Sequence, residues 1–491
     1  MNLNVFLQTA PLFRIFIMLM TGVVSGEFIF STVSPEAALF SLLITIAAIP
    51  FTRHSGIIQS MVLLFAVFLA GLCSYRTAVT NIHLVNPGFY DYRAVVTSSR
   101  KHNRDFSTFD IIRIMDDGAE EKIKSTTKGD VYLCPGDRIH VHSKINKPED
   151  KRKQRFSYAT YLKRNGYAGT TFINVDNIKY AGNYYGDLSL WERLKIKLLL
   201  LRYDILSKIH DSGISGRDFA TVSAMAFGDK TYLTPSDRDI YSKTGVSHVL
   251  ALSGLHIGII YAFLSFLLTF IPKVPRFFAI QIVIWFFVLF AGMSPSLIRA
   301  ALMITIYSGA TLLHRDRIPI NSLSLAGTIS LLVSPQTVFD LCFQLSFISV
   351  FAILLFYKPL TELLPSGPLA VRKIMQMTAV SLAAYIGTMP IILYNFGSIS
   401  FCFILTNLLV IPLTSAVIYL AIITIIPFIG VLSAQLLSVT VHMLNTFVNY
   451  IASISFVSIS NAYISISTAV MIYIIILAVY FIYIHLHTEI K

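Results

Sequence analysis

Long apolar runs separated by short polar loops make up most of the chain. A helix of roughly 20 apolar residues is long enough to cross the hydrocarbon core of a bilayer. Three runs open the sequence, at residues 12–30, 37–51 and 57–78. In the second half we expect spans at residues 249–270, 277–291, 297–313, 323–333, 338–357, 371–394, 401–428 and 465–484, with an amphipathic stretch at 430–456. The pattern predicts a polytopic α-helical membrane protein with about 10–12 spans, in which Pro412 breaks the run at 401–428.

Between residues 81 and 187 the pattern changes to short stretches of alternating apolar and polar residues. Such alternation is typical of strands that are buried on one face. We expect strands at residues 93–99, 108–115, 130–134, 137–145 and 169–175, a turn at Pro135-Gly136-Asp137 and a helix near 158–165. Five short strands in about a hundred residues indicate a small β-barrel or sandwich inserted between the apolar regions.

The segment that follows the strands is amphipathic and basic. Residues 188–210 are expected to form a helix at the membrane surface, followed by two short helices at 218–227 and 235–244. The predicted organisation is N-terminal transmembrane helices at 1–80, a strand-rich domain at 81–187, amphipathic and linker helices at 188–246, and a second transmembrane domain at 247–491.

Composition and charge support the membrane assignment and orient the chain. The 491 residues are 55% hydrophobic and only 13% charged, whereas a soluble domain is about a quarter charged. The net charge is +13, and lysine and arginine fall in alternate loops: Arg53, then Lys273 and Arg276, then Arg315 and Arg317, then Lys358, Arg372 and Lys373. Because positively charged loops stay in the cytoplasm, we expect the N-terminus in the cytoplasm and the strand-rich domain outside it. The last spans have no such loops and are not oriented by this rule.

Several kinds of chemistry have no motif in the sequence. There is no G-x-x-x-x-G-K-[ST] loop for ATP and no H-E-x-x-H zinc motif. The four cysteines include no C-x-x-C pair, and only Cys134 lies in the polar region, so no disulfide is expected within that region. No cofactor or metal site is predicted. The energy for any transport is therefore expected to come from a partner or a gradient.

The segment GVSHVLALSGLHIGII, residues 245–260, places polar groups where a membrane helix is expected to begin. His248 and His256 are eight positions apart, which on an unbroken helix separates them by about 12 Å and 80°, so they would not share one ligand. The Ser253-Gly254 pair either breaks the helix and frees backbone groups to line a path, or provides a close-packing face between helices. Ser253 lacks the G-x-S-x-G context of a catalytic serine.

Other polar residues lie in the apolar runs, where an unpaired polar group is costly. Arg299, near the outer end of one run, either snorkels to the interface or faces a polar cavity. Asp340 and Gln344 are one helical turn apart and therefore on one face. We favour a structural ion pair between Arg299 and Asp340 over a direct ligand role. Asn407, just before Pro412, is expected to line the broken run.

The strand-rich domain contains a basic cluster interleaved with aromatic residues. Basic and aromatic side chains on a small barrel suit single-stranded nucleic acid, through phosphate contacts and base stacking. A solvated loop or a contact with anionic lipid has the same composition and, taken alone, is the simpler interpretation. The candidate DNA-binding residues are Arg138, Lys144, Lys151, Arg152, Lys153, Arg155, Tyr158, Lys163 and Arg164.

The segment GVSHVLALSGLHIG resembles the signature of the ComEC-type competence proteins, the inner-membrane channels for DNA uptake in naturally transformable bacteria. Further segments are similar to that family and occur in the same order: AFGDK, SPSLIRAALM, RDRIPINSLSLAGTISLLVSPQTVFDLCFQLSF and TMPIILYNFGSISFCFILTNLLVIPL. The segment FSYATYLKRNGYAGT is similar to part of the family's extracytoplasmic domain. Together these segments cover most of the chain between residues 90 and 425.

The resemblance implies an extracytoplasmic OB-like domain, a competence-type transmembrane domain in a bacterial inner membrane, and passage of one DNA strand into the cytoplasm. It implies that the partners are single-stranded DNA, membrane lipids, a periplasmic DNA-delivery protein and a cytoplasmic helicase or translocase. The residues that lie in the motif segments, and for which we infer a role in lining or shaping the DNA path, are His248, Ser253, Gly254, His256, Arg299, Asp340, Gln344 and Asn407.

The chain departs from the family pattern in three places. Many members carry a C-terminal metallo-β-lactamase-like domain that has no counterpart here, so we expect a short form without nuclease activity. Some members have a disulfide in the external domain, where this chain has only Cys134, and Cys342 stands where glycine is frequent. Two other functions stay open: a membrane hydrolase that uses His248, Ser253 or His256, and a small-molecule transporter or lipid-interacting protein.

Overall fold

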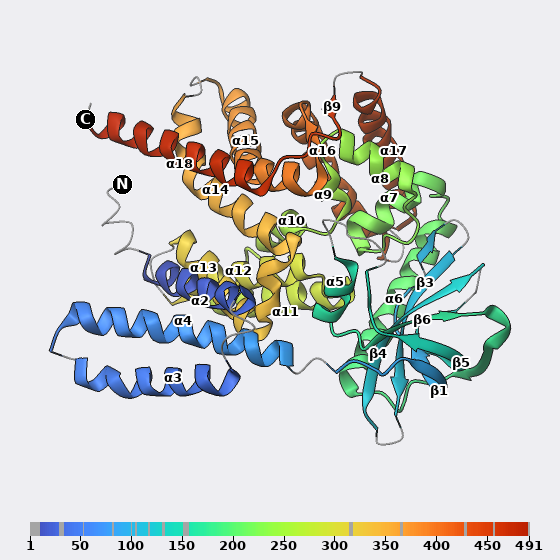
Figure 1. Cartoon of the computed structure of the whole chain (residues 1–491). Coiled ribbons are helices and arrows are strands. Elements are labelled where there is room, and N and C mark those ends of the chain that lie inside the picture. The colour runs from blue at the N-terminus through green and yellow to red at the C-terminus, as the bar shows by residue number, and fades with distance from the viewer. Residues whose placement is uncertain are drawn as a thin grey trace.

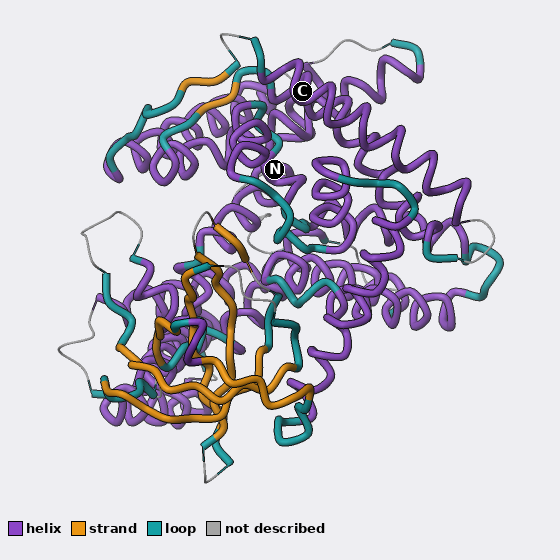
Figure 2. The backbone as a smooth tube through the Cα atoms, turned by 90° about the vertical axis from the view of Figure 1, so that its right-hand side faces the viewer, coloured by secondary structure: helices purple, strands orange, loops and turns teal. Residues whose placement is uncertain are grey.

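The computed structural model describes residues 10–489, except for residues 29–33, 53, 81–82, 100, 104–105, 116–117, 130–132, 151–156, 314–317, 364–366, 427–429 and 455–456. The described part consists mainly of helices, with one large group of strands at an edge of the helical region and a separate short pair of strands (Figure 2). Nine of its helices are long and apolar enough to cross a membrane. The prediction of a polytopic helical membrane protein is confirmed.

The first three helices are α2 (Pro11–Phe28), α3 (Pro35–Ala48), which continues into a short 3-10 turn at Ile49–Thr52, and α4 (Gly56–Thr80). They lie beside one another (Figure 1). Glycines allow α2 and α4 to approach closely. A Cβ on Gly22 would lie 2.0 Å from the carbonyl oxygen of Phe68, and a Cβ on Gly71 would lie 2.4 Å from that of Leu19. Larger residues at these two positions would force the helices apart.

Five strands close into a small barrel. They are β1 (Gly88–Val96), β3 (Phe106–Ile114), β4 (Glu120–Lys128), β5 (Asp137–Asn146) and β6 (Gly169–Ile173). Their hydrogen-bonded order is β1–β3–β4–β6–β5–β1, in which β4 and β6 are parallel and the other neighbours antiparallel. The short strands β2 (Lys101–Asn103) and β7 (Ile178–Asn183) pair with β3 and β5, and α5 (Tyr158–Arg164) precedes β6. The predicted inserted OB-like barrel is present.

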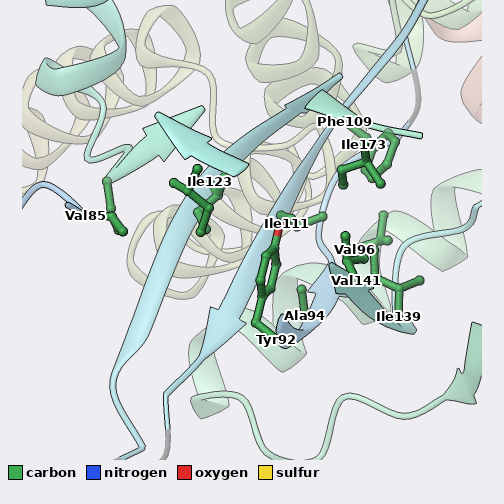
Figure 3. Close-up of a cluster of buried hydrophobic side chains, with 12 residues drawn as sticks. Val85, Tyr92, Ala94, Val96, Phe109, Ile111, Ile123, Ile139, Val141 and Ile173 are labelled. Atoms are coloured by element: carbon green, nitrogen blue, oxygen red, sulfur yellow. The ribbon is translucent and has the colours of Figure 1, made fainter. Parts of the chain in front are cut away.

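Alternate residues of the barrel strands point inwards and form its core. Figure 3 shows Tyr92, Ala94 and Val96 of β1 together with Phe109 and Ile111 of β3, all of them buried. The period of two in the sequence follows from this arrangement, because successive side chains of a strand point to opposite faces. The inward half of the alternation fills the barrel, and on the outer face Val95 and Ile112 pack with Leu188 and Ile196 in a second buried cluster.

One of the five strand predictions is wrong. Leu133 and Cys134, from the strand expected at 130–134, lie outside any strand, and residues 130–132 are outside the described part. The barrel strand that the prediction missed is β4, with the sequence EEKIKSTTK. Its inward positions are filled by one isoleucine and by small hydroxyl residues, of which Ser125 is buried and donates to the carbonyl of Phe109 at 2.6 Å. At the inward positions of β4, hydrogen-bonded serine and threonine replace apolar residues. The sequence of β4 therefore lacks the alternation of apolar and polar residues that identifies a strand.

Linker helices follow the barrel and lead into the second group of spans. The linker helices are α6 (Leu190–Asp211), α7 (Gly216–Phe227) and α8 (Pro235–Lys243). The remaining helices are α9 (Ser247–Leu250), α10 (Gly254–Leu267), α11 (Lys273–Phe290), α12 (Pro295–Leu312), α13 (Pro319–Val333), α14 (Leu341–Leu363), α15 (Leu369–Phe396), α16 (Phe403–Thr424), α17 (Gly430–Ala452) and α18 (Ile466–Glu489). A 3-10 turn at Pro335–Phe339 precedes α14, and two short strands, β8 (Ile399–Ser400) and β9 (Ser458–Ile459), pair with each other.

The structure differs from the prediction at Pro412 and shows a helix interruption near Ser253. The prediction that Pro412 breaks the run at 401–428 is wrong, because α16 continues through it. Membrane helices tolerate an internal proline, since neighbouring groups can satisfy the freed carbonyl. The helix is instead interrupted within the segment 245–260: α9 ends at Leu250, and α10 begins at Gly254.

Candidate functional site

α9 and α10 lie alongside α16, and the two segments run in the same direction. Val249 of α9 and Val410 of α16 belong to one buried cluster. Ile260 of α10 and Ile418 of α16 belong to another. The residues of α10 and α16 between these two layers are therefore at the same depth in the protein.

His256 caps α10 from within its first turn. Its Nδ1 lies 3.2 Å from the backbone nitrogen of Ser253 and 3.0 Å from Ser253 Oγ. The backbone N–H can only donate, so Nδ1 is an acceptor and the neutral ring carries its proton on Nε2. His256 is 0% exposed, and within the described part of the chain its Nε2 has no hydrogen-bond partner. A buried donor without a partner is costly, and this one lies in the motif segment.

Two residues of α16 carry buried oxygen atoms that likewise have no partner among the described residues, Asn407 Oδ1 and Thr414 Oγ1. They are seven positions apart and lie on one face of the helix. Thr414 is in the layer of His256. Pro412 lies between the two and has no N–H, so the carbonyl of Leu408 lacks its helical donor. The sequence analysis missed Thr414, although its spacing from Asn407 is the signal that identifies it.

His248 does not join this group of unpartnered atoms. It belongs to α9, and its side chain is exposed. The described hydrogen bonds connect Ser253 with His256 and not with His248. Residues 251–253 are not helical, so the separation of His248 and His256 expected on an unbroken helix does not hold. Nowhere in the described part do three or more His, Cys, Asp or Glu side chains come together as they would to hold a metal ion.

Arg299 is buried at the start of α12 and does not snorkel. It is 2% exposed, and its Nη2 donates to the carbonyl of Cys342 at 2.6 Å. The guanidinium lies over the ring of Phe343, 5.5 Å from its centroid. The predicted direct ion pair is not among the described salt bridges, although the Asp340 carboxylate is close enough to act on the charge of Arg299. Asp340 Oδ1 instead accepts from the backbone N–H of Cys342 at 3.3 Å and caps α14. Gln344 donates to the carbonyl of Val338 at 3.0 Å.

The barrel contacts the spans through α5 beside this junction. Arg164 lies 3.5 Å from Glu27 at the end of α2, and its guanidinium lies 4.6 Å from the ring centroid of Phe339. Partial burial raises the pKa of Tyr161, and the nearby Asp340 carboxylate raises it further. Arg164, a predicted DNA-binding residue, is therefore engaged in holding the barrel against α2 and the turn before α14.

The other predicted DNA-binding residues are distributed over the barrel. Arg138 pairs with Asp187 at 2.9 Å, and Tyr158 stacks on Tyr161 with ring centroids 6.1 Å apart. Lys144 is exposed and Lys163 is half-buried. Lys151, Arg152, Lys153 and Arg155 lie outside the described residues.

Exposed aromatic residues on the barrel strands were missed by the sequence analysis. Phe89 of β1 stacks on His142 of β5 at 6.0 Å, and Phe106 of β3 meets Phe172 of β6 edge to face at 6.3 Å. All three phenylalanines are exposed large hydrophobic side chains. They occupy outward positions of the strands, where polar residues are expected, and this exception to the alternation is the signal that identifies them.

Comparisons with known proteins agree with the motif segments. The chain is 27% identical over 396 residues to ComE operon protein 3 of Bacillus subtilis, across 77% of this chain and 47% of that protein. It is 30% identical over 174 residues to an uncharacterized protein of Aquifex aeolicus, across 34% of this chain and 38% of the relative. It is 27% identical over 208 residues to Recombination protein 2 of Haemophilus influenzae, across 39% of this chain and 26% of the relative. The chain thus spans half or less of the length of these curated relatives.

No solved structure matches the chain. The family model described as competence protein matches residues 225–486, which contain the interrupted helix, Arg299, the start of α14 and the unpartnered face of α16. Because that match covers more than half of the sequence and includes these motif residues, the chain belongs to the competence protein family, to which the ComEC proteins belong.

Proposed function

We propose that the protein carries one strand of DNA across the cell membrane into the cytoplasm during competence. The observation that carries the proposal is the family match over residues 225–486, combined with buried polar atoms that lack protein partners at the interrupted helix and α16. A polar strand crossing an apolar bundle needs hydrogen-bonding groups along its route, because bare polar groups at membrane depth are costly. His256, Asn407 and Thr414 supply such groups on facing helices.

The external barrel supports the same proposal. Exposed rings such as Phe89 and Phe106 provide surfaces on which unpaired bases stack, and stacking of this kind tolerates any sequence. Lys144, exposed on β5, supplies positive charge for phosphate groups. In this proposal the barrel lies outside the cytoplasm, as the loop charges predict. A periplasmic delivery protein hands DNA to the barrel, and a cytoplasmic translocase draws the strand inwards.

The test is uptake of labelled DNA by cells that lack the gene. We expect DNA still to bind at the cell surface, while the nuclease-protected label inside the cell falls to background and returns when the gene is restored. Uptake at the normal level in the deletion strain would refute the proposal. A His256→Ala strain is the residue-level counterpart, with the exposed Lys358→Ala, remote from the motif residues in the sequence, as its matched control.

One contact favours a second candidate, a membrane hydrolase. Ser253 Oγ lies 3.0 Å from His256 Nδ1, within reach of a serine–base pair. The same Nδ1 also accepts from the backbone N–H of Ser253, as expected for helix capping. If the pair were catalytic, Ser253→Ala would abolish activity completely. If it is a cap, the variant keeps uptake and loses about 1 kcal/mol of stability.

A further inference from the structure

Two hollows lie on either side of the Arg217 side chain at the start of α7. The larger, with a volume of about 540 Å³, is lined by His210, Arg217, Phe219, Tyr232, Ser236 and Asp237. The smaller, of about 230 Å³, lies between α7 and α17. We call the larger one the Arg217 hollow. Its volume is within the range of sites that hold small organic ligands.

Arg217 is held in place but has hydrogen-bonding capacity left over. Its Nη1 donates to Asn449 Oδ1 at 2.5 Å, and its Nε lies 3.0 Å from Asp237 Oδ1. Its Nη2 is buried and has no partner among the described residues. Asp237 is fixed in turn, since its Oδ2 accepts from Thr234 at the start of α8. Arg217 therefore lines the hollow with a rigidly held guanidinium, whose unpaired Nη2 is buried beneath the surface.

An aromatic wall forms the other side of the hollow. The rings of Phe219 and Tyr232 meet edge to face with centroids 4.9 Å apart, and His210 meets Phe219 in the same way at 5.3 Å. Phe219 is buried, whereas Tyr232 is 40% exposed and presents part of its ring to the hollow. A flat, partly apolar ligand would stack on Tyr232.

The charge balance decides which kind of ligand fits. Arg217 faces two carboxylates, Asp237 in the larger hollow and Asp218 in the smaller. Asp218 also accepts from Asn445 at 2.7 Å and lies 3.1 Å from His442. A phosphate group would be repelled by these carboxylates. A neutral heterocycle would not be repelled, and it would lie between the Tyr232 ring and the guanidinium of Arg217.

We infer that the Arg217 hollow binds one unpaired nucleobase of the translocated strand, stacked on Tyr232 beside Arg217. This inference rests on the proposed function. It adds a DNA-binding position on the helices that connect the barrel to the spans. α6, α7 and α8 connect the two parts in the chain, and α7 and α8 pack against α17 (Figure 1). The buried pair Arg202–Asp229, with nitrogen and oxygen 3.9 Å apart, joins α6, which carries His210, to the loop after α7, which carries Tyr232.

The test compares strands with and without bases on the full-length protein in detergent micelles. Fluorescence anisotropy is measured with an oligothymidylate and with an abasic oligonucleotide of the same length. Tyr232→Ala is expected to weaken binding of the oligothymidylate about 5-fold or more, the lower end of one base–aromatic contact, and to leave the abasic strand unchanged. Tyr232→Phe, which keeps the ring, is expected to restore binding. Tyr203→Ala is the matched control, because Tyr203 is 55% exposed on α6 and does not line the hollow.

The outcomes separate this inference from the proposed function. Equal binding of the oligothymidylate by wild type and Tyr232→Ala would overturn the nucleobase site while leaving the proposed function intact. An equal loss on both strands would also overturn it, because the contact would then be to the backbone. If the wild-type protein bound neither strand, the proposed function itself would fail.

Discussion

The unpartnered hydroxyl of Thr414 gives the most direct test of the polar face on α16. Thr414 and Thr406 are both 0% exposed, and both lie on this helix. Thr406 Oγ1 donates to the carbonyl of Cys402 at 2.8 Å, whereas Thr414 Oγ1 has no partner among the described residues. Valine has nearly the shape of threonine without the hydroxyl. The same substitution at the two positions therefore compares a paired hydroxyl with an unpaired one.

The two variants are expected to change stability in opposite directions. A buried hydroxyl without a partner costs about 1–3 kcal/mol, so Thr414→Val should raise the free energy of unfolding by about that amount. Thr406→Val removes a hydrogen bond and should lower it by about 0.5–1.5 kcal/mol. The Cys402 carbonyl keeps its helical donor, the backbone N–H of Thr406 at 2.9 Å, so no new unpaired group adds to that cost.

The assay has two parts, denaturant unfolding of the purified protein in mixed micelles and uptake of labelled DNA by cells. Thr414→Val is expected to unfold at higher denaturant and to take up less DNA, because a polar group has been removed from the path. A loss of stability equal to that of Thr406→Val would refute the assignment of the Thr414 hydroxyl as unpaired. Normal uptake by a stabilised Thr414→Val would refute its place on the path.

Three further predictions concern the cap, the docking of the barrel and its core. Ser253→Ala should keep DNA uptake while unfolding at lower denaturant, because Ser253 with His256 serves as a helix cap; complete loss of uptake by a folded variant would favour the hydrolase instead. Arg164→Ala should increase hydrogen exchange of α5, with Lys163→Ala as control. Because the Arg164–Glu27 ion pair is partly exposed, the loss of stability should be under about 1 kcal/mol. Unchanged hydrogen exchange would contradict the contact of the barrel with α2 through Arg164. Burial raises the pKa of Tyr167 in the folded protein, so as the pH passes about 10 this tyrosine ionises only in the unfolded chain. The stability that the neutral phenol contributes below that pH should therefore be lost above it. Tyr167→Phe should flatten this pH dependence of the free energy of unfolding, measured by denaturant titrations between neutral and high pH.

Long apolar runs predict the membrane spans, because a span needs about 20 apolar residues. Alternation of apolar and polar residues predicts the barrel strands, because one face of each strand is buried. Eight of the nine spanning helices in the described part were predicted as spans, whereas α17 was predicted only as an amphipathic stretch. The runs predicted at 249–270, 297–313 and 323–333 form α10, α12 and α13, which are not among those nine. The prediction fails where local pattern and tertiary environment disagree. β4 has one inward isoleucine, and its buried Ser125 is satisfied by a neighbouring strand, so no apolar alternation is visible. Pro412 lies inside the continuous helix α16, although it removes the helical donor to one carbonyl.

Partners of polar residues are harder to predict than spans, because they depend on how distant segments align. Arg299 and Asp340 have opposite charges and suitable depths, yet Arg299 bonds to the Cys342 carbonyl while Asp340 caps the same helix. Both residues act on the start of α14, so the sequence identified the right neighbourhood and the wrong bond. A helix start offers its own backbone groups to nearby side chains, and these compete with a direct ion pair.

The same reasoning explains why the unpartnered atoms of this protein are informative. His256 Nε2 and Thr414 Oγ1 lie on helices that run in the same direction, between layers formed by Val249 with Val410 and Ile260 with Ile418. A buried donor and a buried acceptor at one depth, neither satisfied by the described protein, are costly unless another molecule supplies the missing bonds. The backbone N–H of Ser253 donates to Nδ1 and so fixes the tautomer of His256. In the neutral ring Nε2 therefore carries the hydrogen and is a donor. In the proposed function, a DNA strand would supply a partner for this donor, because its phosphates and bases are rich in acceptor atoms.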